Sequence, residues 1–218
     1  MIDLQHDGDV FILHMDNGEN RFNAESVGAI HAALDEVAAF DGPKALLTVG
    51  EGKFFSNGLD LEWMQSPEAS DLDGFLEDVH RILGRVLFNE APTAAAINGH
   101  AFAGGSMLAA VHDFRVMRED RGFFCVPEVD LQMPLTPGMS AALQARIPPA
   151  ALHQAVVTGK RWGAGEMFAN QMVEATAPEA EVLATALSWA REQAHHAGET
   201  LAIMKRGLYG LAFEALPT

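Results

Sequence analysis

The chain has 218 residues, of which 49% are hydrophobic, and a formal charge of −16. Its length and apolar content suffice for one domain with a sizeable core, and no linker-like stretch divides it. The strong acidity argues against binding nucleic acid through a general electrostatic field. No apolar run approaches the length that crosses a membrane, and the N-terminus does not have the pattern of a signal peptide, so we expect neither.

The first half of the chain alternates strand-like and helix-like segments. Residues 10–15 alternate as a strand, and Asn23 is a suitable cap for a helix that runs to about Phe40. Residues 45–49 form a short apolar run between glycines, which suits a buried strand, and residues 93–97 are similar. Residues 71–88 place apolar side chains at helical spacing. This alternation predicts an α/β architecture.

The second half is mainly helical by its pattern. Thr136 and Pro137 mark a helix start, and this helix should end near Ile147. Further helices are predicted over residues 150–157 and 178–197, and an apolar stripe runs through residues 199–216. We divide the chain into a core, residues 1–197, and a C-terminal helix, residues 198–218, that packs on the core or on a neighbouring subunit.

Two glycine turns each follow one of the apolar strands. In the first, Ser-Asn-Gly-Leu-Asp at residues 56–60, Gly58 can take positive φ and turn the Leu59 amide outward. Asp60 is expected to accept amide hydrogen bonds at the start of a helix. In the second, Ala-Gly-Gly-Ser at residues 103–106, the Gly104 amide opens a short apolar stretch. If that stretch is a helix, its first amides have no intrahelical acceptor and suit a developing negative charge.

Two amides from separate turns can form an oxyanion hole, and a nearby carboxylate can then move a proton. Either turn alone is typical of an ordinary tight connection. The candidate carboxylate is Glu128, which follows the apolar residues 123–126. A glutamate there is usually solvated, but if it faces inward, desolvation raises its pKa and makes it a stronger base. Asp130 would share its face in an extended segment, as a second acid or as a loop cap.

These segments resemble the crotonase, or enoyl-CoA hydratase/isomerase, superfamily. FSNGLDLEWM at residues 55–64 is similar to the family's first oxyanion segment, and PTAAAINGHAFAGGSMLAAVHD at residues 92–113 to its second. PEVDL at residues 127–131 resembles the segment of its second catalytic glutamate, and TGKR at residues 158–161 its basic turn. The resemblance implies an α/β fold of the ClpP/crotonase type, a spiral of ββα turns with C-terminal helices. It also implies that the Leu59 and Gly104 amides hold a thioester oxygen and that Glu128 is the acid/base.

The sequence departs from the hydratases at one position. Met107 stands where they carry their first catalytic glutamate, and hydration divides the work on water between two carboxylates. One carboxylate suffices to take a proton from carbon 2 of a 3-enoyl thioester and return it to carbon 4 of the dienolate. ENRFN at residues 19–23 and residues 121–130 are similar to small peroxisomal-type 3-enoyl-CoA to 2-enoyl-CoA isomerases, which also lack the first glutamate. We therefore expect an enoyl-CoA isomerase.

The substrate would be an acyl-CoA thioester, with no further cofactor. CoA is an anion, so its phosphates need local basic groups; the candidate contacts are Arg21, Lys53 and Lys205, with the turn at Gly58, although each charge could equally be a solvated surface group. Large apolar residues near the motifs are candidates for the pocket wall or for the core. They are Trp63, Met64, Phe75, Leu76, Phe102, Met107 and Met133.

The resemblance implies a homotrimer or a dimer of trimers, with terminal helices packed between subunits. Other activities stay open: a different crotonase-family lyase, hydratase or hydrolase, or a non-catalytic acyl-CoA-binding paralogue. A Clp-type serine peptidase with Ser106 as nucleophile is a further alternative, but none of the later histidines stands in that family's histidine motif.

Cysteine and histidine usage adds two expectations. The single cysteine, Cys125, excludes an intrachain disulfide framework and fits a reducing, cytoplasmic compartment. The nine histidines include the adjacent pair His195 and His196, which is poorly spaced for shared metal ligation on a helix, and there is no His-Glu-x-x-His motif. We expect no metal site. Asp113 is expected to have a structural role.

Overall fold

Six strands form the main sheet, and they follow one another across it in chain order. The computed structural model describes all 218 residues. The first two strands pair antiparallel, and the remaining neighbours pair parallel. Across the sheet the strands are β1 (Ile2–Asp7), β2 (Val10–Met15), β4 (Ala45–Gly50), β7 (Thr93–Ile97), β9 (Phe114–Arg118) and β11 (Ala175–Ala177).

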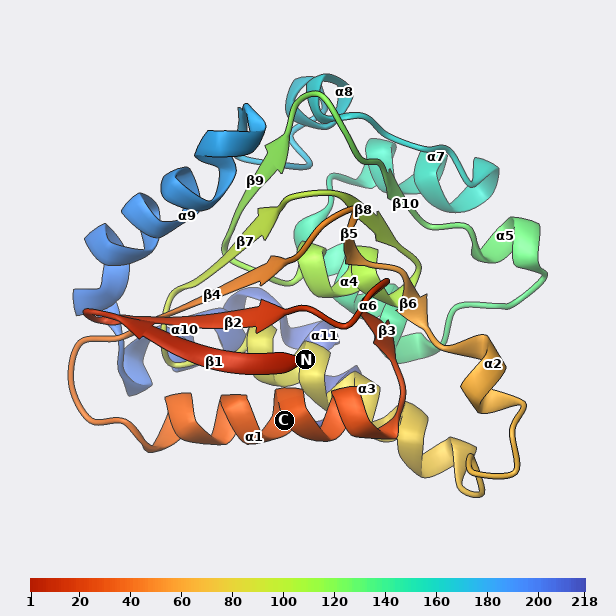
Figure 1. Cartoon of the computed structure of the whole chain (residues 1–218), viewed down its shortest axis with the longest axis horizontal. Coiled ribbons are helices and arrows are strands. Elements are labelled where there is room, and N and C mark those ends of the chain that lie inside the picture. The colour runs from red at the N-terminus through yellow and green to blue at the C-terminus, as the bar shows by residue number, and fades with distance from the viewer.

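Two smaller parallel sheets lie beside the main one. After β4, β7 and β9 the chain enters, in turn, a strand of the three-stranded sheet and then a helix (Figure 1). The repeated path makes a spiral of ββα turns and confirms the predicted fold class. The three-stranded sheet contains β5 (Phe54–Ser56), β8 (His100–Phe102) and β10 (Phe124–Cys125), and the two-stranded sheet contains β3 (Arg21–Phe22) and β6 (Gly58–Leu59).

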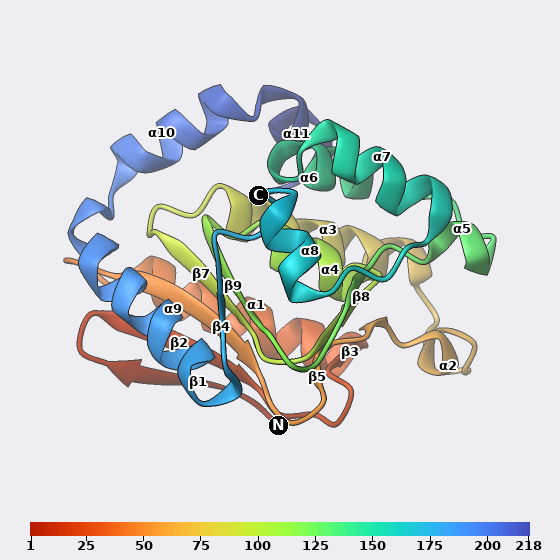
Figure 2. The same cartoon turned by 90° about the horizontal axis from the view of Figure 1, so that it is seen from above.

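Apolar layers cover both faces of the main sheet. Along β4, Leu46 packs with residues of α1 (Ala24–Ala39), whereas its neighbours Ala45 and Leu47 pack with α9 (Glu179–Gln193). Successive side chains of a strand point to opposite faces, so this strand, all six residues of which are buried, is covered on both. The helices α1 and α9 lie on opposite sides of the sheet in Figure 2. No helix combines the length and the apolar character needed to cross a bilayer.

The predicted helix starts agree with the structure. The Asn23 side chain accepts a hydrogen bond from the Ser26 amide at 3.0 Å, and the Ser26 hydroxyl accepts one from the Asn23 amide at 2.9 Å, which caps α1. The Thr136 hydroxyl accepts from the Met139 amide at 3.2 Å and caps α6 (Pro137–Arg146). The other helices are α2 (Leu61–Met64), α3 (Leu72–Leu87), α4 (Gly104–Ala110), α5 (Glu128–Leu131), α6 (Pro137–Arg146), α7 (Pro149–Thr158) and α8 (Ala164–Ala169).

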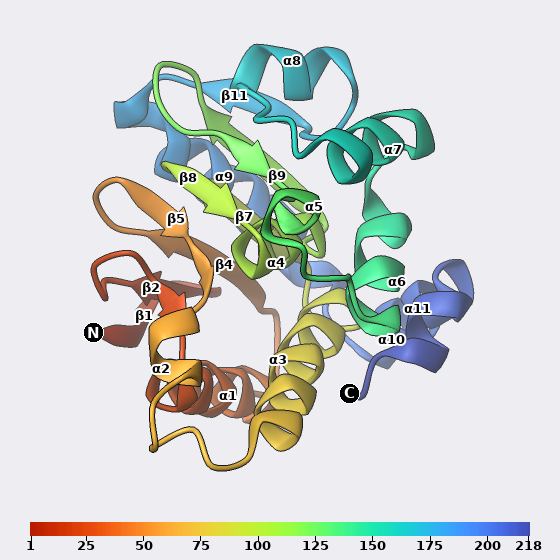
Figure 3. The same cartoon turned by 90° about the vertical axis from the view of Figure 1, so that its right-hand side faces the viewer.

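The C-terminal segment, residues 198–218, was predicted as one helix, but it forms two. α10 (Glu199–Leu208) ends at Tyr209, whose φ of −119° and ψ of 43° are not helical, and α11 (Gly210–Ala215) follows. The shared apolar stripe does not reveal this break because both helices keep the same period. α11 packs against α6 (Figure 3), and Lys205 of α10 donates to Asp113 with an Nζ–Oδ2 distance of 2.7 Å. The structural role expected for Asp113 is confirmed.

Candidate active site

The two glycine turns touch. Gly58 has a φ of +78°, and a Cβ atom there would lie only 2.7 Å from the Gly104 nitrogen and 2.9 Å from the Phe102 oxygen. A Cβ on Gly105 would lie 2.2 Å from the Ser56 oxygen. Only glycine permits this backbone conformation and this close approach together. Gly58 and Gly104 are 46 positions apart in the sequence, yet their turns form one site in space.

The backbone directs both candidate amides away from their own secondary structure. Directly after β6, Asp60 donates its amide to the Phe22 carbonyl of β3 at 2.9 Å. Successive strand amides point to opposite sides, so the Leu59 amide points away from β3. Gly104 is the first residue of α4, and its amide has no acceptor within the helix. Leu59 and Gly104 line the same cavity. An oxygen atom held there can accept a hydrogen bond from the amide of each turn.

Ala103, which precedes α4, has unusual backbone angles, φ 48° and ψ −125°. A residue with a Cβ in this region costs on the order of 1–3 kcal/mol. Its carbonyl accepts hydrogen bonds from the Ser106 amide at 2.9 Å and from the Ser106 hydroxyl at 2.7 Å. Ser106 is fully buried, and His112 instead bonds to Thr48 and to the Leu108 carbonyl. The Ser106 hydroxyl therefore has no hydrogen bond to a histidine, which the serine-peptidase alternative would need.

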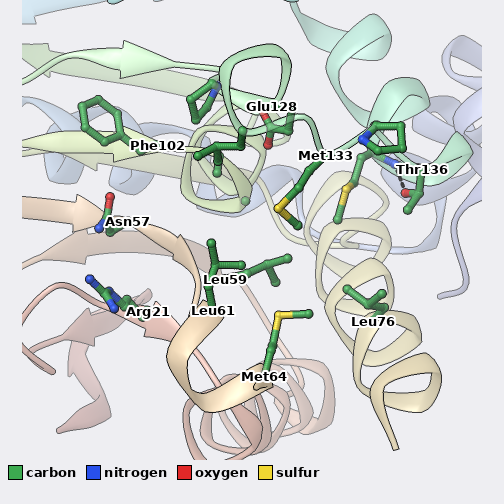
Figure 4. Close-up of a pocket in the computed structure, with 16 residues that line it drawn as sticks. Arg21, Asn57, Leu59, Leu61, Met64, Leu76, Phe102, Glu128, Met133 and Thr136 are labelled. Carbon is green, nitrogen blue, oxygen red and sulfur yellow. Dashed lines mark hydrogen bonds between the residues drawn. The ribbon is translucent and has the colours of Figure 1, made fainter. Parts of the chain in front are cut away.

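The cavity has a volume of about 380 Å³ and lies between the glycine turns, α3, α5 and the start of α6 (Figure 4). Glu128 is the one acidic side chain in its wall. The other lining residues are Arg21, Asn57, Leu59, Leu61, Met64, Leu76, Phe102, Ala103, Gly104, Pro127, Leu131, Met133, Pro134, Thr136 and Met139.

Glu128 is the first residue of α5, and Figure 4 shows its carboxyl group between Phe102 and Met133. Its Oε2 atom is buried and has no hydrogen-bond partner. Burial raises the pKa of this carboxyl to about 7, and a backbone hydrogen bond opposes the shift. A group with a pKa near neutrality can both take and return a proton. The local chemistry therefore suits proton transfer.

Asp130 is not a second acid of this cavity. The segment is helical, so a residue two positions after Glu128 points to a different side. A Cβ atom on Gly159 would lie 2.5 Å from the Asp130 Oδ2 atom, which places this carboxylate against the end of α7. The other expected cap, Asp60, is confirmed, since it accepts from the Trp63 amide at 3.2 Å.

Three residues predicted for the site lie elsewhere. Met107 is fully buried in the core, because α4 runs through the centre of the molecule. Trp63 packs on Phe75, with ring centroids 4.7 Å apart, and lines a separate groove between α1 and α3. Lys205 is buried, and its Nζ atom bonds to Asp113 and to backbone carbonyls. The predictions of Met107 and Trp63 as pocket walls and of Lys205 as a CoA contact are wrong.

Arg21, Met64, Phe102 and Met133 do line the cavity. The Arg21 guanidinium bonds to Glu19, with a distance of 2.7 Å from Nε to Oε2. Glu19 also accepts from the Asn57 side chain at 2.8 Å. One carboxylate therefore holds two polar residues of the cavity wall.

Sequence inspection missed a basic group beside Phe102. The Arg161 guanidinium lies 5.6 Å from the centre of the Phe102 ring, and the exposed Lys53 lies 5.3 Å from that of Phe54. Burial first, and then the charges of Lys53, Arg161 and Arg121, lower the pKa of His100. Arg161 belongs to the basic turn that the sequence resemblance identified, which was the available signal.

The fold places two turn amides and one half-buried carboxylate around the same cavity, an arrangement that can stabilise an enolate. The sequence profile of the enoyl-CoA hydratase/isomerase family matches residues 6–213. The chain belongs to this family. It is 32% identical to the peroxisomal enoyl-CoA delta isomerase 2 of Arabidopsis thaliana, over 96% of this chain and 92% of that protein. With enoyl-CoA delta isomerase 3 of the same plant the identity is 31%, with the same coverage.

Solved structures agree on the fold. An enoyl-CoA hydratase from Mycobacterium ulcerans superimposes with a TM-score of 0.90 at 26% identity, covering 98% of this chain and 93% of that one. The human mitochondrial delta3-delta2-enoyl-CoA isomerase has a TM-score of 0.87 at 21% identity, covering 98% of this chain and 84% of that one. At that identity the human structure supports the fold alone.

Proposed function

We propose that this protein is an enoyl-CoA isomerase that moves the double bond of a 3-enoyl-CoA to the 2-position. The observation that carries the proposal is a single acidic side chain, Glu128, whose Oε2 atom is buried without a partner in a cavity that the Leu59 and Gly104 turns also line. The two Arabidopsis relatives that match nearly the whole chain are named enoyl-CoA delta isomerases, which supports the same activity.

In this mechanism the thioester oxygen lies between the Leu59 and Gly104 amides. The Glu128 carboxylate takes a proton from carbon 2, and the electron pair moves into the thioester as the double bond shifts to form a dienolate. Glu128, now protonated, returns the proton to carbon 4, which leaves the double bond between carbons 2 and 3. By analogy with oxyanion donors elsewhere, each amide contributes about 2.7–4 kcal/mol to the transition state. The positioned base adds about 10²–10⁴-fold in rate.

Hydration is disfavoured by the same cavity. Adding water to a 2-enoyl thioester requires a water held and deprotonated while a proton reaches carbon 2, and the hydratases use two carboxylates for this. Here the cavity wall has one acidic side chain, and Met107 occupies the position of the other. A single group shuttling one proton between two carbons needs no bound water.

CoA is proposed to enter from the side of Arg21 and Asn57. Arg21 lies in the cavity wall, and Lys53 precedes β5, the strand that leads into the Gly58 turn. These two cations are the proposed contacts of the CoA phosphates, with the Gly58 turn beside the pantetheine arm. Arg161, on Phe102, extends the positive charge at this edge. No cofactor besides the CoA of the substrate is proposed.

The test is conversion of a 3-enoyl-CoA to the conjugated 2-enoyl thioester, followed by its ultraviolet absorbance. Glu128→Gln keeps the shape of the side chain and removes the base, so we expect a loss of at least about 10²-fold in kcat. Asp130→Asn, an exposed carboxylate in the same helical turn, is the matched control and should retain activity. Equal turnover by Glu128→Gln and the wild-type protein would remove Glu128 from the mechanism.

We also propose that the enzyme assembles as a homotrimer or a dimer of trimers. α10 and α11 expose five apolar side chains, a stripe suited to burial against another subunit. They are Ile203, Met204, Leu208, Leu211 and Phe213, with exposed fractions from 40% to 77%.

A reducing, cytoplasmic location is proposed from the one cysteine. Cys125 is buried, and its thiol donates to the Gly159 carbonyl at 3.2 Å, so it serves as a core residue. Fractionation of cells with an antibody to the protein tests this location.

A further inference from the structure

One polar side chain stands at the end of the cavity farther from Arg21. Figure 4 shows Arg21 and Asn57 at one side of the cavity, Thr136 at the other, and Leu59 and Glu128 between them. The remaining side chains around Thr136 are apolar. They are Met64, Leu76, Leu131, Met133 and Met139. If CoA enters beside Arg21, the acyl chain extends from the glycine turns toward Thr136.

The Thr136 hydroxyl is paired with an imidazole. Its Oγ1 atom lies 2.7 Å from the Nε2 atom of His80 and accepts the Met139 amide at 3.2 Å. Burial lowers the pKa of His80, although the charge of Glu77 opposes the shift, and this direction favours the neutral ring. A neutral imidazole nitrogen is a donor in one tautomer and an acceptor in the other.

The pair therefore has hydrogen-bonding capacity left for the cavity. When His80 accepts the hydroxyl proton, Oγ1 keeps a lone pair beyond the one used by the Met139 amide. When His80 donates instead, the hydroxyl proton is free to point into the cavity. The pair can thus donate to, or accept from, an oxygen atom on a ligand.

The position of His80 is fixed by packing. It lies on α3 one turn after Leu76, and its Cδ2 atom is 3.4 Å from where a Cβ on Gly138 would stand. The hydrogen bond therefore joins α3 to the start of α6, and both helices contribute to the cavity wall through Leu76 and Met139. A hydroxyl held from two helices offers a directed contact.

We propose that the preferred substrates are 3-enoyl-CoAs whose acyl chain carries a hydroxyl or oxo oxygen, which the Thr136–His80 pair binds. The inference rests on the proposed isomerase function and adds the class of acyl group to it. The cavity would favour acyl chains that carry an oxygen near Thr136, because that oxygen forms a hydrogen bond with the pair. At any other point of the apolar wall the oxygen would lose its hydrogen bonds to water without replacement.

The test compares 3-enoyl-CoAs of increasing length with ω-hydroxy analogues in which a hydroxyl replaces the terminal methyl. For the wild-type protein we expect kcat/KM to favour the hydroxy analogue by about three- to tenfold, the effect of one net hydrogen bond. The preference should appear at one chain length, where the oxygen reaches Thr136. A ratio between two substrates does not depend on the fraction of folded enzyme, so it remains valid for variants with a weakened helix cap.

Thr136→Ser retains the hydroxyl and should keep the preference, whereas Thr136→Val should reduce the ratio to about one and His80→Phe, which no longer orients the hydroxyl, should lower it. Ser140→Ala removes a hydroxyl of α6 outside this cavity and should leave the ratio unchanged. Turnover of the plain substrates without a preference at any length would overturn this inference and leave the isomerase function standing. A preference that persists in Thr136→Val would also overturn it. No isomerisation of any 3-enoyl-CoA would refute the proposed function and this inference with it.

Discussion

Glu128 combines a titratable group with an apolar setting. Its Oε2 atom has no partner in the folded protein, and no basic side chain contributes to the shift of its pKa. Desolvation is therefore the principal cause, and it acts by disfavouring the charged form. Such a carboxylate is a stronger base than an ordinary surface glutamate, while its protonated form still exists at neutral pH.

The pH dependence of isomerisation should follow this group. Glu128 must be ionised to take the proton from carbon 2, so kcat/KM falls as the pH decreases through its pKa of about 7. Initial rates measured between weakly acidic and weakly alkaline pH give this decrease in kcat/KM. Asp130→Asn is the control, and its pH dependence should equal that of the wild-type protein. A midpoint near 4.5, the ordinary value for a glutamate, would contradict the buried setting described here.

Met107 provides a second prediction at the residue scale. It is fully buried in the core, so Met107→Glu puts a carboxyl group among apolar neighbours instead of into the cavity. We expect this variant to lose on the order of 3–5 kcal/mol of unfolding free energy and to gain no hydratase activity. Urea unfolding and an assay for water addition to a 2-enoyl-CoA measure both effects. Met107→Leu is the control and should cost less than about 1.5 kcal/mol. A folded, hydrating Met107→Glu enzyme would show that this position reaches the substrate.

At the scale of elements, the site depends on how closely two turns approach. β6 and the start of α4 belong to different ββα units, and the glycines at their junction leave no room for a methyl group. Their amides keep their positions because each turn is fixed by its own strand and helix. Preorganised donors of this kind need no rearrangement when negative charge develops.

Gly58→Ala should damage both stability and activity. The residue has a φ of +78°, and an added Cβ would lie 2.7 Å from the Gly104 nitrogen. We expect a loss of roughly 2–4 kcal/mol and a fall in kcat, because the Leu59 amide must move. Gly52→Ala is a matched control, since Gly52 has a φ of +66° with nothing within 4 Å of the added Cβ. It should lose only about 1 kcal/mol and keep kcat. Denaturant titration measures the unfolding free energy of each variant, and initial rates measure kcat. Equal kcat values for the two variants would contradict the proposed oxyanion hole.

At the scale of the whole molecule, the exposed stripe on α10 and α11 is the surface for which self-association is expected. Leu208 and Leu211 are 71% and 77% exposed. The double change Leu208→Glu and Leu211→Glu should convert the oligomer to smaller species, because burying two carboxylates opposes assembly. Light scattering coupled to size exclusion measures the mass. Leu183→Glu on α9, where Leu183 is 42% exposed, is the control for a carboxylate placed elsewhere. An unchanged mass in the double variant, or a monomeric wild-type protein, would contradict the proposal.

The charge of the molecule is also arranged at this scale. Against a total of −16, Lys53, Arg121 and Arg161 gather around His100 beside the cavity. The three come from separate segments of the chain, so composition does not indicate that they meet. A local cluster of this kind reconciles an acidic protein with an anionic substrate.

The sequence by itself determined the features that depend on neighbours along the chain. Local propensity and period predicted three strands of the main sheet (β2, β4 and β7), the caps at Asn23 and Thr136, and the turn glycines, and the family resemblance of the motifs indicated the spiral. It also identified Leu59, Gly104 and Glu128 as a group. These inferences hold because hydrogen bonds within a turn or a helix start involve residues a few positions apart.

The tertiary structure alone decided which apolar and charged side chains face the cavity. Packing places Met107 in the core, Trp63 in another groove and Lys205 in an internal ion pair, although all three are residue types expected at such a site. The Thr136–His80 contact joins residues 56 positions apart, and no local pattern indicates it. The physical reason is that burial depends on how distant elements pack together, which short-range periodicity does not encode.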